Sequence, residues 1–152
     1  MSNWLLVSSP ENFERSRAIG FATTAMKSRH QRKWERVQPG DRIFYYLTGE
    51  KAIGGIARVT GEPFESHEGI WGSASKPLED YPWRFPSQPV VILEPGSFVP
   101  AEPLAREMAY TKRWPAENWT LAFQGNVHEV SDADAELIER AVRRAAPEKV
   151  PA

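Results

Sequence analysis

The most charged stretch of the sequence runs from residue 27 to residue 36 and reads KSRHQRKWER. It holds five basic residues and one acidic residue, so its net charge is 5 − 1 = +4. On a helix, four of these cations recur at three- and four-residue spacing: Arg29, Arg32, Lys33 and Arg36. Such a stripe can lie along a phosphate backbone, but a solvated helix face has the same pattern, and both interpretations stay open.

A second pattern is a set of aromatic residues that could line a pocket: Phe21, Phe44, Tyr46, Trp71 and Trp83. Stacking is worth about 1–3 kcal/mol per base, so two such rings suffice to hold one nucleobase. Aromatic residues in strands more often pack in a core. Trp71 and Trp83 fall in a predicted loop, where binding residues are common, and they are the stronger candidates.

Most signatures of catalysis and metal binding are missing from the sequence. The chain has no cysteine, which excludes disulfides, cysteine nucleophiles and thiolate zinc sites. Its three histidines, His30, His67 and His128, do not have metal-binding spacing. The serines and threonines show no nucleophile elbow, and no glycine-rich phosphate loop is present. We therefore expect no catalytic residue, no metal and no cofactor.

Chain length and net charge limit the number of domains and the classes of partner that the protein can have. The chain has 152 residues, and we expect a single domain over residues 1–145 followed by a short flexible tail over 146–152. Its net charge is −1, so any surface for nucleic acid must be local. The apolar stretch at residues 4–7 is too short for a signal or a membrane span. We expect a cytoplasmic protein that does not bind membranes and is taken as a monomer.

These residues must be positioned by elements that the sequence also predicts. In the first half we expect a strand at 4–9, a helix at 10–20 capped by Ser9, a helix at 24–36, and strands at 42–48 and 52–60. Side chains of the 42–48 strand alternate, with Tyr45 on one face and Tyr46 on the other. Gly54 and Gly55 mark a bulge or a close backbone approach in the strand that follows.

The second half is predicted to begin with a loop-rich segment at 66–88, followed by a strand at 90–93. A turn and a short strand at 123–130 precede a C-terminal helix that starts at the capping pattern of residues 131–134. Strands interrupted by short helices indicate a small α+β domain built around a curved sheet or a partly open barrel.

Several segments together resemble one family: WLLVSSPENF, SRHQRKWERVQPGDRIFYYL, VTGEPF, YPWRF and WTLAFQGNVHEVSDADAELIERA. They resemble the EVE domain, a member of the PUA-like superfamily related to the YTH readers of modified RNA. The resemblance runs from Asn3 to about Ala141. It implies a PUA-like curled β-barrel of about five or six strands with peripheral helices, and a pocket that accepts a flipped-out modified base.

The resemblance also implies which residues form that pocket. Polar residues that read the base edge in the YTH relatives map approximately onto Ser8 and Asn12. Relatives have a cage tryptophan just after the first helix, where this chain has Ala22 beside Phe21. The full set that we predict to bind nucleic acid is Ser8, Asn12, Phe21, Thr23, Lys27, Arg29, Arg32, Lys33, Tyr46, Trp71, Trp83 and Arg84.

The leading hypothesis is a non-enzymatic module that binds DNA or RNA carrying a modified base. A modified nucleoside is a further possible ligand. One alternative is a small hydrolase of the ASCH type acting on modified nucleosides, which Thr23, Thr24 and Lys27 motivate. The other is a protein-interaction module with a vestigial pocket, consistent with Ala22 in the slot of the cage tryptophan.

Overall fold

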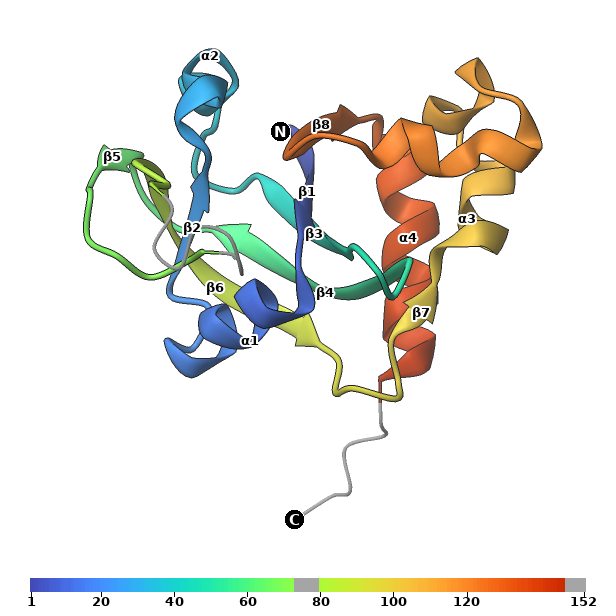
Figure 1. Ribbon diagram of the computed structural model, residues 1–152, viewed down its shortest axis with the longest axis horizontal. Helices are drawn as coiled ribbons and strands as arrows, with labels where there is room; N and C mark the ends of the chain where they lie inside the picture. Colours follow the sequence, from blue (N-terminus) through green and yellow to red (C-terminus); the bar gives the residue numbers. More distant parts are fainter. Residues whose placement is uncertain (73–79, 147–152) are drawn as a thin grey trace.

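The computed structural model describes residues 1–72 and 80–146 (Figure 1). Its elements are β1 (Asn3–Ser8), α1 (Pro10–Ala18), β2 (Thr23–Met26), η1 (Ser28–His30), α2 (Gln31–Trp34), β3 (Arg42–Leu47), β4 (Ala52–Val59), β5 (Phe64–Glu65), β6 (Trp83–Ile92), β7 (Val99–Pro100), α3 (Ala101–Glu107), η2 (Tyr110–Arg113), η3 (Ala116–Phe123), β8 (Val127–Val130) and α4 (Asp132–Ala145). Six strands form a curled sheet in the order β2-β6-β4-β3-β1-β8, and the short β5 and β7 pair with β6 and β4. This curled mixed sheet with peripheral helices confirms the predicted α+β domain built around a curved sheet.

Most of the predicted elements are confirmed, together with the local chemistry that starts or bends them. The hydroxyl of Ser9 caps α1 by accepting a hydrogen bond from the Asn12 backbone N–H at 3.1 Å. Ser131 caps α4 in the same way. The bulge predicted in the strand after Gly49 lies at Gly54. Tyr45 of β3 pairs with Gly55 and Tyr46 pairs with Ile53, so Gly54 between them is left out of the pairing. A Cβ on Gly54 would lie 2.9 Å from side-chain atoms of Leu47 and Phe13, so the close approach there requires glycine.

Two predictions of secondary structure are wrong. The segment 24–36 does not form one helix, because Thr23–Met26 is strand β2, and only η1 and the four-residue α2 are helical. The end of the predicted loop at 66–88 belongs to β6, which starts at Trp83 and pairs with β2. Pro86 and Pro89 conceal this strand in the sequence. Pro86 pairs with Thr23 of β2. Pro89 pairs with Ala57 of β4, directly beside the shift in register between Ile56 and Ala57.

The sheet separates two hydrophobic cores, because neighbouring side chains of a strand point to opposite faces. One core lies inside the curl of the sheet and includes Leu6, Phe13 and Tyr45. The other lies between the sheet and the C-terminal helices and includes Leu5 and Tyr46, packed with residues of α3 and α4. Figure 1 shows α3 and α4 together on this second side. Strands β1 and β3 are therefore buried on both faces.

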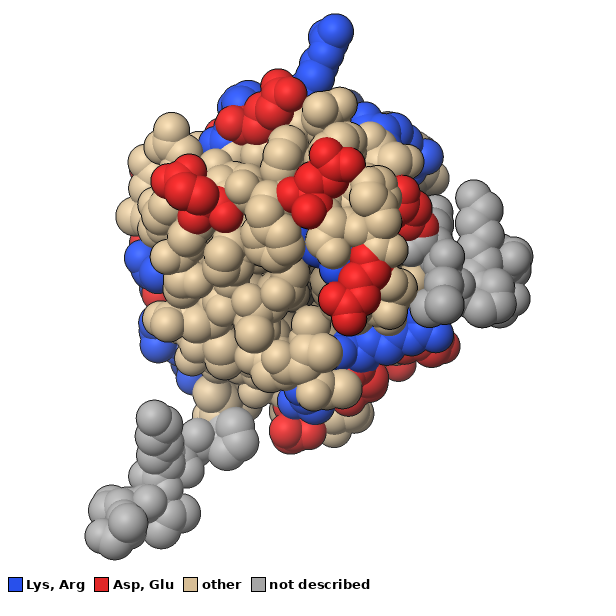
Figure 2. All heavy atoms as spheres, turned by 90° about the vertical axis from the view of Figure 1, so that its left-hand side faces the viewer, with Lys and Arg blue, Asp and Glu red and all other residues tan. Residues whose placement is uncertain are grey.

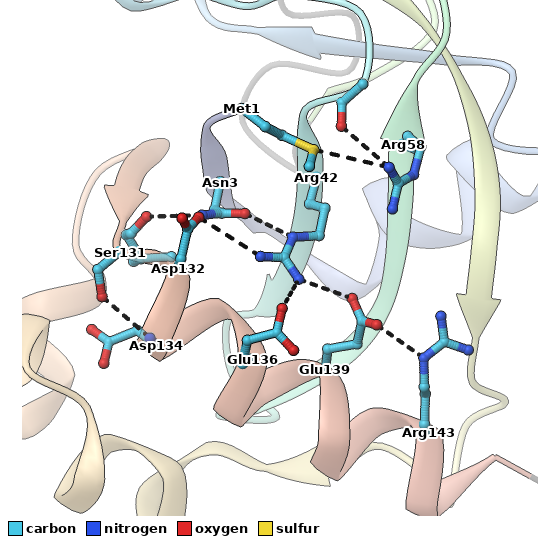
Figure 3. Close-up of polar contacts among 12 residues, drawn as sticks. Met1, Asn3, Arg42, Arg58, Ser131, Asp132, Asp134, Glu136, Glu139 and Arg143 are labelled. Carbon is cyan, nitrogen blue, oxygen red and sulfur yellow. Dashed lines mark hydrogen bonds and ion pairs between the residues drawn. The ribbon is translucent and has the colours of Figure 1, made fainter.

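A polar cluster around Arg42 joins α4 to β1 and β3 (Figure 3). The Arg42 side chain is only 9% exposed and donates to Glu136 at 2.7 Å and to Glu139 at 3.3 Å, both on α4. Its Nε donates to Asn3 on β1 at 2.8 Å. Burial alone would raise the pKa of Glu139, but hydrogen bonds from Arg143 and Arg42 outweigh it and hold the pKa below its usual value.

Within residues 1–72 and 80–146, no helix is long and apolar enough to cross a membrane. The same residues contain no group of three or more histidines and carboxylates arranged to hold a metal ion. The predicted tail lies outside the described residues except for Ala146.

Replacing Arg42 by Met should lower the free energy of unfolding by about 2 kcal/mol, because charged hydrogen bonds to two carboxylates and to Asn3 are lost. Urea unfolding at neutral pH measures this change. Arg143→Met is the matched control, since Arg143 makes only a surface i,i+4 pair with Glu139 and should cost no more than about 0.5 kcal/mol. Equal losses in the two variants would contradict the role given to Arg42.

Candidate functional site

A cavity opens inside the curl of the sheet, between the end of β1, the start of α1, β2 and residues 66–72 and 80–82. These residues before β6 form neither helix nor strand, and we call them the irregular segment. We call it the inner cavity, and its lining residues are Leu6, Val7, Ser8, Asn12, Ser16, Thr24, Ala25, Tyr45, Trp71, Tyr81 and Asn126. Its volume is about 40 Å³. This is room for roughly three water molecules at roughly 10–15 Å³ each. A wider outer cavity of about 280 Å³ shares Ser8, Asn12, Tyr81 and Asn126 with it and reaches Lys27 and Arg29.

Two aromatic residues of the irregular segment form one wall of the inner cavity. The rings of Trp71 and Tyr81 lie with centroids 5.8 Å apart and planes at 59°. The Trp71 indole N–H donates to the hydroxyl of Ser16 on α1 at 3.0 Å, which fixes the ring against the helix. Both side chains are nearly buried, with residue exposures of 5% and 8%. The wall is therefore an ordered part of the domain.

Asn12 joins this wall to α1. Its Oδ1 accepts a hydrogen bond from the backbone N–H of Gly72 at 2.9 Å, and its Nδ2 donates to the hydroxyl of Tyr81 at 3.4 Å. Because the side chain contacts the wall on both sides of the segment 73–80, it positions both aromatic rings. Ser8, at the end of β1, lies beside it in the lining of both cavities.

Asn126 forms the opposite side of the cavity, directly before β8. Its Oδ1 accepts from the backbone N–H of Lys27 at 3.0 Å, and its Nδ2 donates to the carbonyl of Val7 at 3.3 Å. The side chain thus joins the ends of β1 and β2 to the start of β8. Nothing in the sequence except its position beside a predicted strand indicated this role.

The floor of the inner cavity is a closed hydrogen-bonded group. The Thr24 hydroxyl lies 2.7 Å from the hydroxyl of Tyr45 and 3.0 Å from that of Ser87. Complete burial raises the pKa of Tyr45, and its hydrogen bond with Thr24 opposes this only in part. The floor is therefore neutral across the physiological pH range.

Arg84 lies behind the aromatic wall and is only 3% exposed. Its Nε donates to the carbonyl of Tyr81 at 3.0 Å, and its Nη2 donates to the carbonyl of Glu68. The guanidinium carbon lies 5.2 Å from the centre of the Trp71 ring. Burial lowers the pKa of this group, although Glu68 and Asp80 oppose the effect. The structure therefore places Arg84 in support of the wall, away from a surface where phosphates could reach it.

The basic side chains of the segment 27–36 differ in exposure and in their contacts. Arg29, Arg32 and Arg36 are exposed, although Arg29 donates to His30 at 3.3 Å and Arg36 pairs with Glu129. The half-buried Lys33 donates from its ammonium to the Val127 carbonyl at 2.9 Å. Figure 2 shows that the face bearing β2, β5 and α2 carries interspersed positive and negative side chains, without a continuous basic band. The regular stripe expected of a long helix is not formed.

Four other predicted binding residues lie outside both cavities. Phe21 is buried in the inner core against Phe13 and Tyr45, one layer below the floor. Tyr46 stacks on Phe123 on the other side of the sheet, as the alternation of β3 requires. Trp83 packs on Trp34 with ring centroids 4.9 Å apart, and Thr23 lies on β2 opposite Pro86.

The structure thus brings together Ser8, Asn12, Trp71, Lys27 and Arg29 from the predicted set. Besides Leu6 and Val7, the lining residues of the inner cavity outside the predicted binding set are Ser16, Thr24, Ala25, Tyr45, Tyr81 and Asn126, and of these Thr24 was considered only for the hydrolase alternative. Tyr81 carried a signal, because it stands in the same aromatic-rich segment as Trp71. The others are brought to the cavity by strand pairing and by α1, which spacing alone does not show.

A comparison of this sequence with the sequence profiles of known families identifies its family. The profile of the EVE domain matches residues 2–141. This chain belongs to the EVE domain family. It is also 27% identical over 150 residues to the UPF0310 protein PH1033 of Pyrococcus horikoshii, a match that covers 92% of this chain and 98% of that protein.

Solved structures share the fold of this EVE domain at low sequence identity. The YTH domain of the Zygosaccharomyces rouxii MRB1 protein, in complex with N6-methyladenosine RNA, has a TM-score of 0.66 at 14% identity, covering 99% of this chain and 89% of that one. Human THYN1, in complex with DNA containing 5-methylcytosine, has a TM-score of 0.59 at 15% identity, covering 99% and 100%.

Two histidines of the EVE domain should respond to pH in opposite directions. Burial, and then the nearby Lys33 and Arg29, lower the pKa of His30 to about 4. In the unfolded chain its pKa is about 6.5, so the unfolded state binds the proton first as the pH falls. The contribution of His30 to the free energy of unfolding is fully present above pH 6.5 and is lost as the pH falls toward 4. Hydrogen bonds with Glu65 and Asp80 raise the pKa of His67 instead.

We expect His30→Gln to flatten part of the loss of stability between pH 6.5 and pH 4.5, because it removes one of the groups that bind a proton on unfolding. His128, whose pKa burial also lowers, accounts for another part. Urea unfolding at several pH values measures it. His67→Gln is the control: its raised pKa gives stability that is present at low pH and lost as the pH rises, so the acid-induced loss should not flatten. An unchanged pH dependence in His30→Gln would contradict the burial of His30.

Proposed function

We propose that this EVE domain binds DNA or RNA that carries a modified base, without acting on the base chemically. The base, turned out of the strand, lies in the outer cavity of about 280 Å³, and its edge reaches the inner cavity, which by itself is smaller than a nucleobase. The observation that carries the proposal is the composition of the cavity. Two ordered aromatic rings, Trp71 and Tyr81, stand beside the polar side chains of Asn12 and Ser8. The cavity opens past the cations Lys27 and Arg29.

The energies of such binding are consistent with this composition. Turning a base out of its stack costs a few kcal/mol. Stacking on an aromatic side chain returns about 1–3 kcal/mol, and hydrogen bonds to the base edge add to it. The rings of the wall are already fixed by Ser16, Asn12 and Arg84, so little further ordering is needed on binding.

The proteins that share the fold support a nucleic-acid ligand. The MRB1 YTH domain is in complex with N6-methyladenosine RNA, and THYN1 is in complex with DNA containing 5-methylcytosine. These are two different modifications on two different nucleic acids. The shared feature, a modified base in a nucleic acid, is what we carry over to this chain.

Roles within the site follow from position. Trp71 and Tyr81 stack on the base, while Ser8, Asn12 and Asn126 contact its edge. Lys27 and Arg29 at the mouth, with Arg32 beyond them, contact phosphates of the strand. Binding without reaction is preferred over nucleoside hydrolysis because the Thr24 hydroxyl is held between Tyr45 and Ser87.

Trp71→Ala should lower affinity for the preferred modified oligonucleotide about 5- to 150-fold, because it removes one stacking surface worth about 1–3 kcal/mol. Fluorescence anisotropy at fixed salt, with DNA and RNA carrying methylated, hydroxymethylated or unmodified bases, measures both the affinity and the preference. Chromatography of modified nucleosides incubated with the protein should recover them unchanged.

Trp83→Ala is the matched control, since this ring packs on Trp34 outside the cavity. It should keep the preference for the modified base, provided that circular dichroism shows both variants folded. The proposal fails if the wild type shows no preference for any modification, or if Trp83→Ala abolishes the preference while Trp71→Ala retains it. Release of an altered nucleoside would favour the hydrolase.

A further inference from the structure

The amide side chains of the inner cavity are oriented by the backbone. Asn12 Oδ1 accepts from the Gly72 N–H and, at 3.4 Å, from Arg15, whereas Asn126 Oδ1 accepts from the Lys27 N–H alone among the described residues and keeps one lone pair. Each amide nitrogen carries two hydrogens and donates only one of them within the described residues, to Tyr81 and to Val7 respectively. Asn12 therefore offers a ligand an N–H donor, and Asn126 offers an N–H donor and one acceptor lone pair.

A cation, Arg84, lies behind the aromatic wall, and the carboxylates of Glu68 and Asp80 compensate its charge in part. The buried guanidinium of Arg84 is bonded to the carbonyls of Tyr81 and Glu68, and forms no ion pair with a carboxylate of the described residues. It lies 5.2 Å from the centre of the Trp71 ring. Lys27 and Arg29 stand at the mouth, and no aspartate or glutamate lines either cavity in residues 1–72 and 80–146.

This arrangement is the reverse of a cage for cations. An aromatic cage attracts a cation through the negative face of its rings. Here Trp71 already faces a guanidinium, and the Asn12 side chain beside it offers a ligand a donor. A cationic base stacked on Trp71 would lie roughly 10 Å from this guanidinium, where repulsion at an effective dielectric constant of about 20 weakens binding on the order of tenfold.

We propose that the inner cavity selects modified bases that are neutral and present acceptor atoms, and rejects bases that alkylation has made cationic. The inference rests on the proposed function. Cytosine substituted at carbon 5 and adenine methylated on its exocyclic nitrogen belong to the accepted class, since both stay neutral and keep ring nitrogens that accept hydrogen bonds. The rejected class contains 3-methylcytosine and 1-methyladenine, which carry a positive charge at neutral pH.

The test compares bases of equal shape that differ in charge. Oligonucleotides of one sequence carry 3-methylcytosine or its neutral counterpart 3-methyluracil, and 1-methyladenine or its neutral counterpart 1-methylhypoxanthine. Affinity is measured by anisotropy at pH 7, beside 5-methylcytosine, N6-methyladenine and unmodified controls. The members of a pair share their phosphates but differ in charge and in one exocyclic group, an amino donor in the cation and a carbonyl acceptor in the neutral base. Variants that change only the charge of the cavity are therefore needed to assign the ratio to charge. We expect the cationic member of each pair to bind about tenfold more weakly.

Three variants test whether the charge of the cavity sets that ratio. Arg84→Gln should bring the ratio toward one, whereas Arg84→Lys should retain it. Asn12→Asp keeps the shape of the side chain but places a carboxylate in the lining, and should favour the cationic member by about tenfold over wild type. If Arg84→Gln does not fold, the wild-type ratio and the Asn12→Asp variant still decide the outcome.

The outcomes separate this inference from the proposed function. Preference for a neutral modified base with weak binding of the cationic members supports both. Preference for a modified base together with a cationic-to-neutral ratio of one, or with tighter binding of the cations, overturns the charge selection and leaves the reader function standing. No preference for any modified base over the unmodified strand overturns the proposed function, and the charge selection with it.

Discussion

Burial of β1 and β3 on both faces is the constraint on which the site depends. Consecutive side chains of these strands must enter different cores, so Tyr45 joins the floor of the cavity while Tyr46 packs toward α3 and α4. On the helical side, α3, η3 and α4 close the core. On the inner side, the sheet is covered near the end of β1 by α1 and an irregular segment, and the inner cavity lies between them.

An irregular wall can serve as a binding surface only if something fixes it. Here side chains of regular elements satisfy the backbone of the wall: Asn12 of α1 binds the Gly72 N–H, and Arg84 of β6 binds the Tyr81 carbonyl. Ser16 of α1 holds the indole of Trp71. These contacts do two things at once, because they satisfy buried polar groups and set the polarity that a ligand meets.

The sequence predicted best where local chemistry decides the structure, as in the capped helices and the alternating strand β3. It failed at β6, where Pro86 and Pro89 conceal a strand held by its neighbours β2 and β4. The same distinction between local and long-range signals holds for the residues of the site. Asn12 follows directly from the start of α1, whereas Asn126 and Tyr81 reach the cavity only through pairing of distant segments. Such long-range placement leaves little local signal.

The central claim is that a base of the bound strand enters beside Trp71. Its most direct test is a titration of the isotope-labelled protein with an oligonucleotide carrying the preferred modification, followed through the indole N–H signals of its six tryptophans. The account predicts the largest shift for Trp71, whose N–H donates to Ser16 in the cavity wall. Shifts confined to Trp34 and Trp83, with Trp71 unmoved, would place the nucleic acid on the surface around α2 and contradict the account.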